Sequence, residues 1–305
     1  MRAALVLETD NLVAIDQRND AVVAGVERLL GRLAGATLPL RQLDEVVVAH
    51  HGFDARDQAR LVRAAGCTVR FVALPPEAGY YDAKNRGFAV TTADVVAFGD
   101  GDCWPHPRWL EALLAPFARG PAVRVVAGRT VYAGGRLGAA LTAIDFQPVP
   151  SPLGRGCVRH FLANNVAFRR DVFAERPFEP RPDLHRGACG VLAMRLHRER
   201  IPIHDAPGAL TTHRTPEGTD ELVERRMQRG ADLATLAPEI ARTHLPRALA
   251  WVGSLGRVSP MVLLGGRLVT AAAAIARQGS RGAAARASIA LGITAIDAWG
   301  ALAGH

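Results

Sequence analysis

The sequence predicts an α/β fold with a mostly parallel sheet flanked by helices, followed by a helical C-terminal extension. Short apolar runs alternate with segments of helical periodicity over the first two thirds of the chain. That alternation is typical of βαβ units joined by right-handed crossovers. From residue 217 onward the pattern is helical and contains no convincing strand. We therefore expect one domain over residues 1–215 and a helical extension over residues 216–305.

Each predicted element follows from its apolar pattern. Strands are expected where short apolar, β-branched runs are bounded by polar turns, at residues 3–8, 45–50, 68–73, 94–98, 123–128, 164–169, 201–204 and 209–213. Helices are expected where apolar residues recur every three to four positions, at residues 20–33, 54–65, 80–90, 106–117 and 188–199. The glycine- and proline-rich stretch 132–159 is expected to be a loop with a short helix.

Two carboxylates, Asp100 and Asp102, follow the predicted strand 94–98. In extended backbone, residues two apart point their side chains the same way. Parallel α/β sheets place their ligands at the carboxyl ends of the strands. Paired hard oxygen ligands at that edge suit a divalent cation that carries phosphates. The pair is a weak motif alone, because any acidic surface turn supplies one.

An ordered series of motifs around these aspartates resembles the family-2 glycosyltransferases of the GT-A fold. The series consists of Ala83-Lys84-Asn85-Arg86-Gly87, the strand ending in Asp100-Gly101-Asp102, and Trp104-Pro105-His106-Pro107-Arg108-Trp109-Leu110. The resemblance extends loosely over about residues 3–230 and implies a GT-A-like, Rossmann-type nucleotide-sugar domain. It also implies Mn²⁺ or Mg²⁺ as cofactor, held by Asp102 with Asp100 and with His213, which ends the strand 209–213.

The same resemblance implies which residues face the donor and the acceptor. The donor side would comprise strand ends, the helix 80–90 and an arginine-rich segment beyond the last strand, namely Glu8, Asp10, Asn11, His50, Lys84, Asn85, Arg86, Asp100, Arg226 and Arg229. Asn164 and Asn165 would lie on the acceptor side. Simpler alternatives remain: a surface histidine at position 50, and a solvated helix face around Arg226 and Arg229.

The helix 188–199 departs from the family pattern. It resembles an E-D-x-x-L-x-x-R-L element whose aspartate is the catalytic base of inverting members, but Ala188 and Cys189 replace both acids. A neutral thiol is a poor base. Asp183, and after it His185, are our candidates for the base, because both lie just before this helix. The alternatives are an acceptor that needs little help from a base, and a protein that does not catalyse.

The net charge of +8 is concentrated in the tail. Residues 240–305 hold seven arginines and one acid, Asp297, so they contribute +6 and leave the rest at +2. A nearly neutral main domain argues against a nucleic-acid groove. The apolar runs of the tail reach at most ten residues before a charge, which predicts helices lying on an anionic membrane surface without spanning it. A packed subdomain or a homo-oligomer interface is the alternative.

Other features of the sequence indicate the cellular compartment of the protein. The four cysteines are scattered without a CxxC pair, which indicates free thiols in a reducing compartment. The N-terminus starts at once with a strand and shows no signal-peptide pattern. The arginine and alanine excess, with Lys84 as the lone lysine, is typical of a GC-rich bacterial source. We expect a cytoplasmic protein, peripheral at the inner face of the plasma membrane.

These observations predict a metal-dependent, inverting glycosyltransferase. Its donor would be a nucleoside-diphosphate sugar, with UDP-sugar as our choice, and its acceptor a lipid-linked molecule or cell-envelope glycan. A non-catalytic nucleotide-sugar-binding or protein-binding relative is the alternative, favoured by the missing base and disfavoured by the aspartate pair. A sugar nucleotidyltransferase is disfavoured because the segment after the first strand lacks a glycine-rich, basic phosphate loop.

Overall fold

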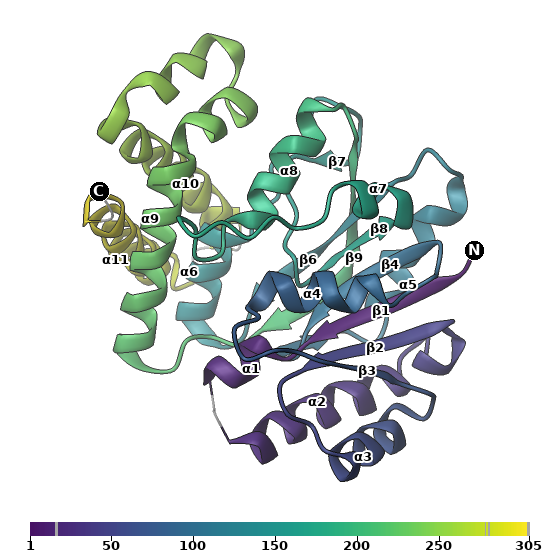
Figure 1. Ribbon diagram of the computed structural model, residues 1–305. Helices are drawn as coiled ribbons and strands as arrows, with labels where there is room; N and C mark the ends of the chain where they lie inside the picture. The colour runs from purple at the N-terminus through teal and green to yellow at the C-terminus, as the bar shows by residue number, and fades with distance from the viewer. Residues whose placement is uncertain (16–17, 278, 280, 304–305) are drawn as a thin grey trace. The chain divides into compact units, whose positions relative to one another are not determined.

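The computed structural model describes residues 1–15, 18–277, 279 and 281–303, and it divides into two compact units (Figure 1). The first unit comprises Met1–Thr130, Pro150–Glu179 and Ile201–His213. The second comprises Val131–Val149, Pro180–Arg200 and Arg214–His305. We expected one boundary at residue 215. The chain passes from the first unit to the second for the last time between His213 and Arg214, close to that boundary. Two internal segments, residues 131–149 and 180–200, also belong to the second unit.

The first unit is built on one mixed sheet of nine strands. The strands are β1 (Ala3–Glu8), β2 (Glu45–His50), β3 (Arg70–Ala73), β4 (Val95–Asp100), β5 (Cys103–Pro105), β6 (Val125–Tyr132), β7 (Cys157–Val158), β8 (Val166–Arg169) and β9 (Ile203–His213). Their order is β3-β2-β1-β4-β8-β6-β9-β5, with β7 paired to β9. The first four are parallel, and β8 continues the sheet antiparallel to β4 and β6. The α/β sheet expected from the sequence is confirmed.

Helices pack on this sheet through apolar stripes. Those of the first unit are α1 (Asp10–Ile15), α2 (Asn19–Ala34), α3 (Ala55–Ala65), α4 (Tyr80–Ala89), α5 (Trp109–Leu114) and α7 (Arg170–Glu175), with 3₁₀ turns η1 (Leu40–Gln42) and η2 (Ala115–Arg119). Helix α3 shows how local chemistry sets the ends. Asp54 and Asp57 form a reciprocal capping box at its start, and Gly66 ends it with φ 63°. The sequence did not predict α1 or α7.

Two boundary differences affect the site. Strand β4 runs on to Asp100 instead of ending at Phe98, so the first carboxylate belongs to the strand itself. The two short strands expected at 201–204 and 209–213 form the single strand β9. Its length carries His213 to the same end of the sheet as β5, because Cys103 pairs with His213.

The second unit is helical. It contains α6 (Gly135–Asp145), α8 (Ala188–Arg198), α9 (Gly218–His244), α10 (Ser259–Arg277) and α11 (Ala283–Ala303), with 3₁₀ segments η3 (Arg247–Ser254) and η4 (Gly256–Val258). Two glycines let α9 and α11 approach closely. A Cβ on Gly230 would lie 2.1 Å from the carbonyl oxygen of Asp297, and one on Gly300 would lie 2.3 Å from that of Met227. The tail is therefore packed within its own unit.

The apolar runs 258–266 and 268–276 of the tail are one helix. Together with the preceding turn, Gly256–Arg277 reaches a mean hydropathy of 1.6, which is long and apolar enough to cross a membrane by length and composition. The expectation that no segment qualifies on these grounds is wrong. One such helix is weak evidence, because core helices of soluble proteins meet the same criterion.

Candidate active site

The parallel pair β1 and β4 places two acidic residues side by side. Glu8 and Asp100 are register partners at the carboxyl ends of these strands. The chain then turns at Gly101, whose N–H donates to the Glu8 carbonyl at 3.0 Å. A Cβ on Gly101 would lie 3.0 Å from the Glu8 carbonyl oxygen and 2.8 Å from the Leu12 side chain, so a larger residue would be crowded in this turn. Asp102 therefore lies in a turn, and the extended-backbone explanation of the aspartate pair is corrected.

Asp100 is a buried carboxylate whose charge is compensated by the protein. The ammonium of Lys84, itself fully buried, donates to it at 2.5 Å. The Tyr80 hydroxyl donates at 2.9 Å and the Asn11 side-chain amide at 3.0 Å. The lone lysine of the chain is thus the counter-ion of Asp100. The sequence missed Tyr80, although its position one helical turn before Lys84 places both side chains on one face of α4.

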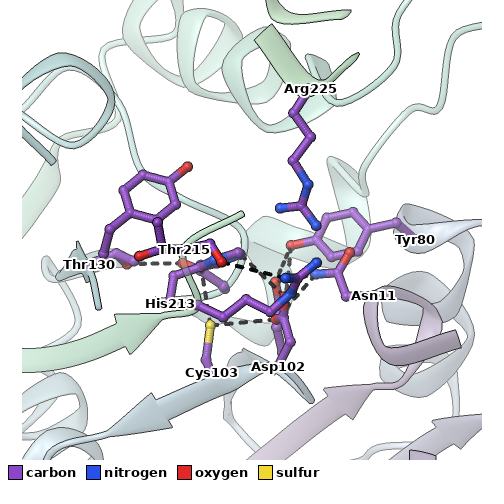
Figure 2. Close-up of polar contacts among 12 residues, drawn as sticks. Asn11, Tyr80, Asp102, Cys103, Thr130, His213, Thr215 and Arg225 are labelled. Atoms are coloured by element: carbon purple, nitrogen blue, oxygen red, sulfur yellow. Dashed lines mark hydrogen bonds and ion pairs between the residues drawn. The ribbon is translucent and has the colours of Figure 1, made fainter. Parts of the chain in front are cut away.

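Asp102 has a different environment. Its Oδ1 lies 3.4 Å from the Asn11 side-chain nitrogen and 3.8 Å from the Cys103 sulfur. Its Oδ2 is buried and accepts no hydrogen bond from the described residues. The Nε2 of His213 lies 3.4 Å from that oxygen. Figure 2 shows the side chains of Asp102, Cys103 and His213 converging from the ends of β4, β5 and β9.

This cluster fits a divalent cation. Ligand atoms of Asp102, Cys103 and His213 lie within 4.8 Å of one another. A buried carboxylate oxygen without a donor is costly, and a cation would relieve that cost. Burial, reinforced by Asp102 and Asp100, raises the pKa of the Cys103 thiol well above its ordinary value. A protonated thiol is a weak ligand, so carboxylate and imidazole are the donors that suit Mn²⁺ or Mg²⁺ here.

Glu8 and Asn11 complete the acidic cluster. The Asn11 backbone N–H donates to Glu8 Oε2 at 3.2 Å, while its side chain reaches both aspartates. Glu8 Oε1 is a second buried carboxylate oxygen that no donor in the described ranges reaches. Burial, together with the charge of Asp100, raises the pKa of Glu8 well above its ordinary value. Asp10, also predicted for this edge, begins α1.

His50 is buried at the end of β2, so the alternative of a plain surface histidine is wrong. Its Nδ1 accepts a hydrogen bond from the Phe53 N–H at 2.9 Å, and the two rings stack with centres 4.6 Å apart. Burial lowers the pKa of His50. The imidazole is therefore neutral and keeps its other nitrogen as a donor.

Asn85 and Arg86 lie inside α4, which begins at Tyr80. They lie more than one turn beyond the start of the helix, so the free backbone amides there do not belong to these two residues. The Asn85 side chain donates to the Phe178 carbonyl at 2.8 Å and accepts from its N–H at 3.2 Å. It holds the segment around Phe178 against the helix. Arg86 is exposed.

The two predicted acceptor-side asparagines differ. Asn165 is fully buried, and it donates to the carbonyls of Arg129 at 2.8 Å and Ala209 at 2.9 Å. Its oxygen accepts from the Trp109 indole at 2.8 Å, so this side chain joins the sheet to α5.

Asn164 lies beside the metal candidates. Its oxygen accepts from the Thr130 hydroxyl at 3.0 Å, and its nitrogen lies 3.6 Å from the Cys103 sulfur. Thr130 is a neighbour that the sequence did not indicate.

Comparison with known proteins bears on this geometry. A family model described as "Glycosyl transferase family 2" matches residues 26–176. The matched segment belongs to glycosyl transferase family 2. The pre-mycofactocin glycosyltransferase of Mycobacterium tuberculosis is 34% identical over 122 residues, which are 40% of this chain and 24% of the relative. The glucosyl-3-phosphoglycerate synthase of Mycolicibacterium smegmatis is 29% identical over 174 residues, 52% and 54% of the two chains. The matches thus span about a quarter to about half of these relatives.

Solved structures confirm the GT-A fold. A mannosyltransferase from Pyrobaculum calidifontis, in complex with GDP-Man and Mn²⁺, has a TM-score of 0.62 at 18% identity, covering 99% of this chain and 86% of that one. The glucosyl-3-phosphoglycerate synthase from Mycobacterium tuberculosis, in complex with Mg²⁺ and uridine diphosphate, has a TM-score of 0.51 at 22% identity, covering 81% of each chain. The expectation of Mn²⁺ or Mg²⁺ agrees with the metals in these two structures.

The arginine-rich segment lies in the second unit. Arg226 is buried and donates to both oxygens of Asp145 at 2.8 Å and to Asp297 at 2.7 Å. The prediction that Arg226 contacts the donor is corrected, because its guanidinium is already used by two carboxylates. Arg229 lies 3.4 Å from Asp145 and is 35% exposed, so its donor-side role stays a prediction. Arg225 pairs with Glu221 at 2.8 Å, as a solvated helix face would.

The candidate bases also belong to the second unit. Asp183 is exposed, and its hydrogen bond from Arg181 at 2.9 Å lowers its pKa. His185 Nδ1 lies 3.2 Å from Asp232, whose carboxylate also accepts the N–H groups of His185 and Arg186. Nothing in the sequence indicated Asp232, which is 47 residues from His185. Both base assignments remain predictions.

Proposed function

We propose that the protein is a metal-dependent glycosyltransferase that moves a sugar from a nucleoside-diphosphate sugar, UDP-sugar being our choice, to an acceptor hydroxyl. The observation that carries this proposal is the buried Asp102 oxygen that accepts no hydrogen bond from described residues and lies 3.4 Å from His213 Nε2. Membership of the matched segment in glycosyl transferase family 2 supports the reaction class.

Asp102 and His213 would hold Mn²⁺ or Mg²⁺. When bound, such an ion neutralises charge that develops on a leaving diphosphate. Asp100 has a supporting role, since Lys84 compensates its charge while Asp100 holds Asn11 and Tyr80 by hydrogen bonds. The protein thereby keeps one buried carboxylate paired and leaves its neighbour available.

The nucleobase edge would be formed by Glu8, Asn11 and His50. The pKa of His50 is lowered by burial, so at neutral pH its ring is an uncharged hydrogen-bonding group. A carboxyl group with a raised pKa, as at Glu8, can donate a hydrogen bond to a carbonyl of a base. This combination suits a neutral ring with exposed carbonyl and N–H groups.

We now rank His185 ahead of Asp183 as the candidate base, the reverse of the order expected from the sequence. Asp232 fixes the imidazole through Nδ1, which leaves Nε2 to take the proton of the acceptor hydroxyl. In the inverting reaction, the acceptor oxygen bonds to the anomeric carbon as the bond to the diphosphate oxygen breaks. Asp183 is a weaker base, because the hydrogen bond from Arg181 lowers its pKa.

The acceptor and the compartment are proposed more broadly. We propose a cytoplasmic enzyme whose acceptor is lipid-linked or a cell-envelope glycan. An acceptor that is itself an acid or a phosphate is an alternative, consistent with the glucosyl-3-phosphoglycerate synthase among the relatives. Such an acceptor would reduce the need for the acidic base that Ala188 and Cys189 replace.

The test is nucleotide binding measured by thermal shift. UDP, GDP, ADP and CDP are each added to the protein with Mn²⁺, with Mg²⁺ or with EDTA. We expect UDP to raise the melting temperature only with metal, and Asp102→Asn to abolish that increase. Asp171→Asn is the matched control, because Asp171 is an exposed aspartate of the same unit paired with Arg124. Equal metal-dependent shifts in both variants would contradict the proposed metal site.

A non-catalytic relative is the second candidate, and the replacement of both acids by Ala188 and Cys189 favours it. It would bind a nucleoside diphosphate with metal yet release no UDP from UDP-glucose, UDP-galactose or UDP-N-acetylglucosamine. Release of UDP that depends on both Mn²⁺ and an acceptor pool would exclude this candidate.

A further inference from the structure

The connection between α9 and α10, residues 245–258, and the first turn of α10 expose a group of large apolar side chains. Leu249 is 44% exposed, Trp251 57%, Val258 55% and Val262 43%. Large apolar side chains that gather on one short segment indicate an interaction surface more strongly than the same residues scattered singly. The proposed transfer reaction does not use these residues.

The exposure of this connection is not the result of loose packing. Val252, the neighbour of Trp251, is 3% exposed. A Cβ on Gly253 would lie 2.8 Å from the carbonyl oxygen of Pro238 in α9, so the backbone is in close contact with that helix. Ser259 is fully buried where α10 begins. Buried residues therefore hold the segment against its own unit, while Leu249 and Trp251 are exposed.

Between residues 240 and 262 the charged side chains are arginines, while Glu239, just before them on α9, is paired with Arg198. Arg242, Arg247 and Arg257 are exposed, and no carboxylate lies within ion-pair distance of them in the described part of the chain. Residues 240–305 contain one acid, Asp297, which is buried and already paired with Arg226. The partner of this surface should therefore be anionic.

A second copy of the chain fits poorly, because a self-complementary contact would bring these arginines against their own equivalents. An anionic bilayer fits both properties. Tryptophan is favoured at the membrane–water interface, where its ring is apolar and its N–H remains hydrated. Arginines beside such residues are attracted to anionic headgroups.

We propose that the α9–α10 connection binds the surface of an anionic phospholipid bilayer, with Trp251 and Leu249 entering the interface and Arg247 and Arg257 contacting headgroups. The binding is peripheral. It is independent of the proposed transferase activity, and it would place the protein beside a lipid-linked acceptor.

The experiment is sedimentation of the full-length protein with vesicles of phosphatidylcholine, alone or mixed with phosphatidylglycerol. We expect binding to the mixed vesicles at low salt and release as salt rises to about 0.5 M, because screening weakens the headgroup contacts. Trp251→Ser should lower the partition coefficient roughly tenfold. Trp299→Ser is the matched control, because Trp299 is a 63% exposed tryptophan on α11, outside the α9–α10 connection. It should bind like the wild type.

The charge contribution is tested separately. Arg247→Gln with Arg257→Gln should lower binding to mixed vesicles on the order of 30-fold, from about 1 kcal/mol per arginine. Arg56→Gln with Arg63→Gln is the control, because it removes two exposed arginines from α3 in the first unit. Thermal melting checks that each variant is folded.

Four outcomes would overturn the proposal. The first is that the protein binds neutral and mixed vesicles equally well. The second is that Trp299→Ser loses as much vesicle binding as Trp251→Ser. The third is that protein from expressing cells stays in the membrane fraction through washes with high salt and alkaline carbonate, as it would if Gly256–Arg277 spanned the membrane. The fourth is a dimer in light scattering that Trp251→Ser dissociates while vesicles bind nothing.

Discussion

Asp102 in the first unit and Asp297 in the second are both buried aspartates, at 4% and 1% exposure, but their surroundings are opposite. Asp297 accepts hydrogen bonds from Nε and Nη2 of Arg226, one on each of its oxygens. Asp102 keeps one oxygen that accepts no hydrogen bond from the described residues and lies 3.4 Å from His213 Nε2. A buried carboxylate whose oxygens all accept hydrogen bonds is satisfied by the protein itself, whereas one with an oxygen that accepts none is a candidate ligand for a cation.

The helical unit uses its buried charges to join helices. Arg226 of α9 connects Asp145 of α6 with Asp297 of α11, and Gly230 and Gly300 let α9 and α11 pack closely enough for this. Burial alone would raise the pKa of Asp145, but the charges of Arg226 and Arg229 lower this pKa to about 2. The acidic cluster of the first unit has Lys84 as its buried cation, and Lys84 contacts Asp100. The two units therefore respond to charge removal in different ways.

The strongest expected effect is on activity, and it comes from Asp102→Asn. Losing a metal ligand should lower UDP release from a UDP-sugar by about 10³-fold or more, since the leaving diphosphate would go uncompensated. The melting temperature should stay within about 2 °C of the wild type, because Oδ2 contributes no hydrogen bond to the fold. EDTA should reduce the wild type to the same rate. A variant that stays active, or that unfolds, would remove the distinction between the two aspartates.

The second prediction concerns stability. Arg226→Met should lower the free energy of unfolding by about 3–5 kcal/mol, because it leaves Asp145 and Asp297 buried without their cation. Urea unfolding followed by circular dichroism measures the change. Arg225→Met is the matched control, one position away and partly exposed beside Glu221, and it should change stability by less than about 1 kcal/mol. Similar decreases in the free energy of unfolding for both variants would show that the buried ion pairs of Arg226 do not stabilise the fold more than an exposed pair does.

The third prediction concerns the base. His185→Gln should lower turnover ~100-fold, the usual scale for losing a general base. Asp183→Asn and Cys189→Ala should stay within a few-fold, because Asp183 is exposed and held by Arg181 and the Cys189 thiol is a weak base. A ~100-fold loss in Asp183→Asn alone would reassign the base to that carboxylate.

The smallest effect is on the pH dependence of stability. The pKa of Asp145 is about 2 in the folded protein and near 3.8 in the unfolded chain. Its contribution is complete above the unfolded value and is lost as pH falls toward the folded one. Between pH 5 and pH 3 the wild type should therefore lose about 1 kcal/mol more than Asp145→Asn. Urea titrations at the two pH values measure it, and equal losses would show that Asp145 is not stabilised as a charge.

Much of the first unit could be predicted from local pattern. The strands β1 and β2 begin and end where their apolar runs do, and the predicted α4 and α8 differ from the structure by one residue at one end. The motif around Asp100 and Asp102 indicated the family, which the family comparison confirmed. These features depend on residues close in sequence, where spacing alone decides the outcome.

The roles of single polar residues were harder to predict. Asn85 and Asn165 match the family's motifs, yet their side chains bind backbone groups of the protein itself. Arg226 looked like a diphosphate ligand until its partners, 81 and 71 residues away, were known. No spacing rule indicates such partners, because they meet only when helices and strands pack.

The sequence by itself determined the α/β class, the family, the aspartate pair and a basic, apolar tail. Only the tertiary structure decided which charges are satisfied. Lys84 pairs with Asp100 and Arg226 pairs with Asp297, whereas one oxygen of Asp102 accepts no hydrogen bond from the described residues. It also decided that Trp251 points outward while Val252 is buried. The physical reason is that burial and hydrogen bonding are properties of contacts between distant segments, whereas apolar periodicity and turn residues act locally.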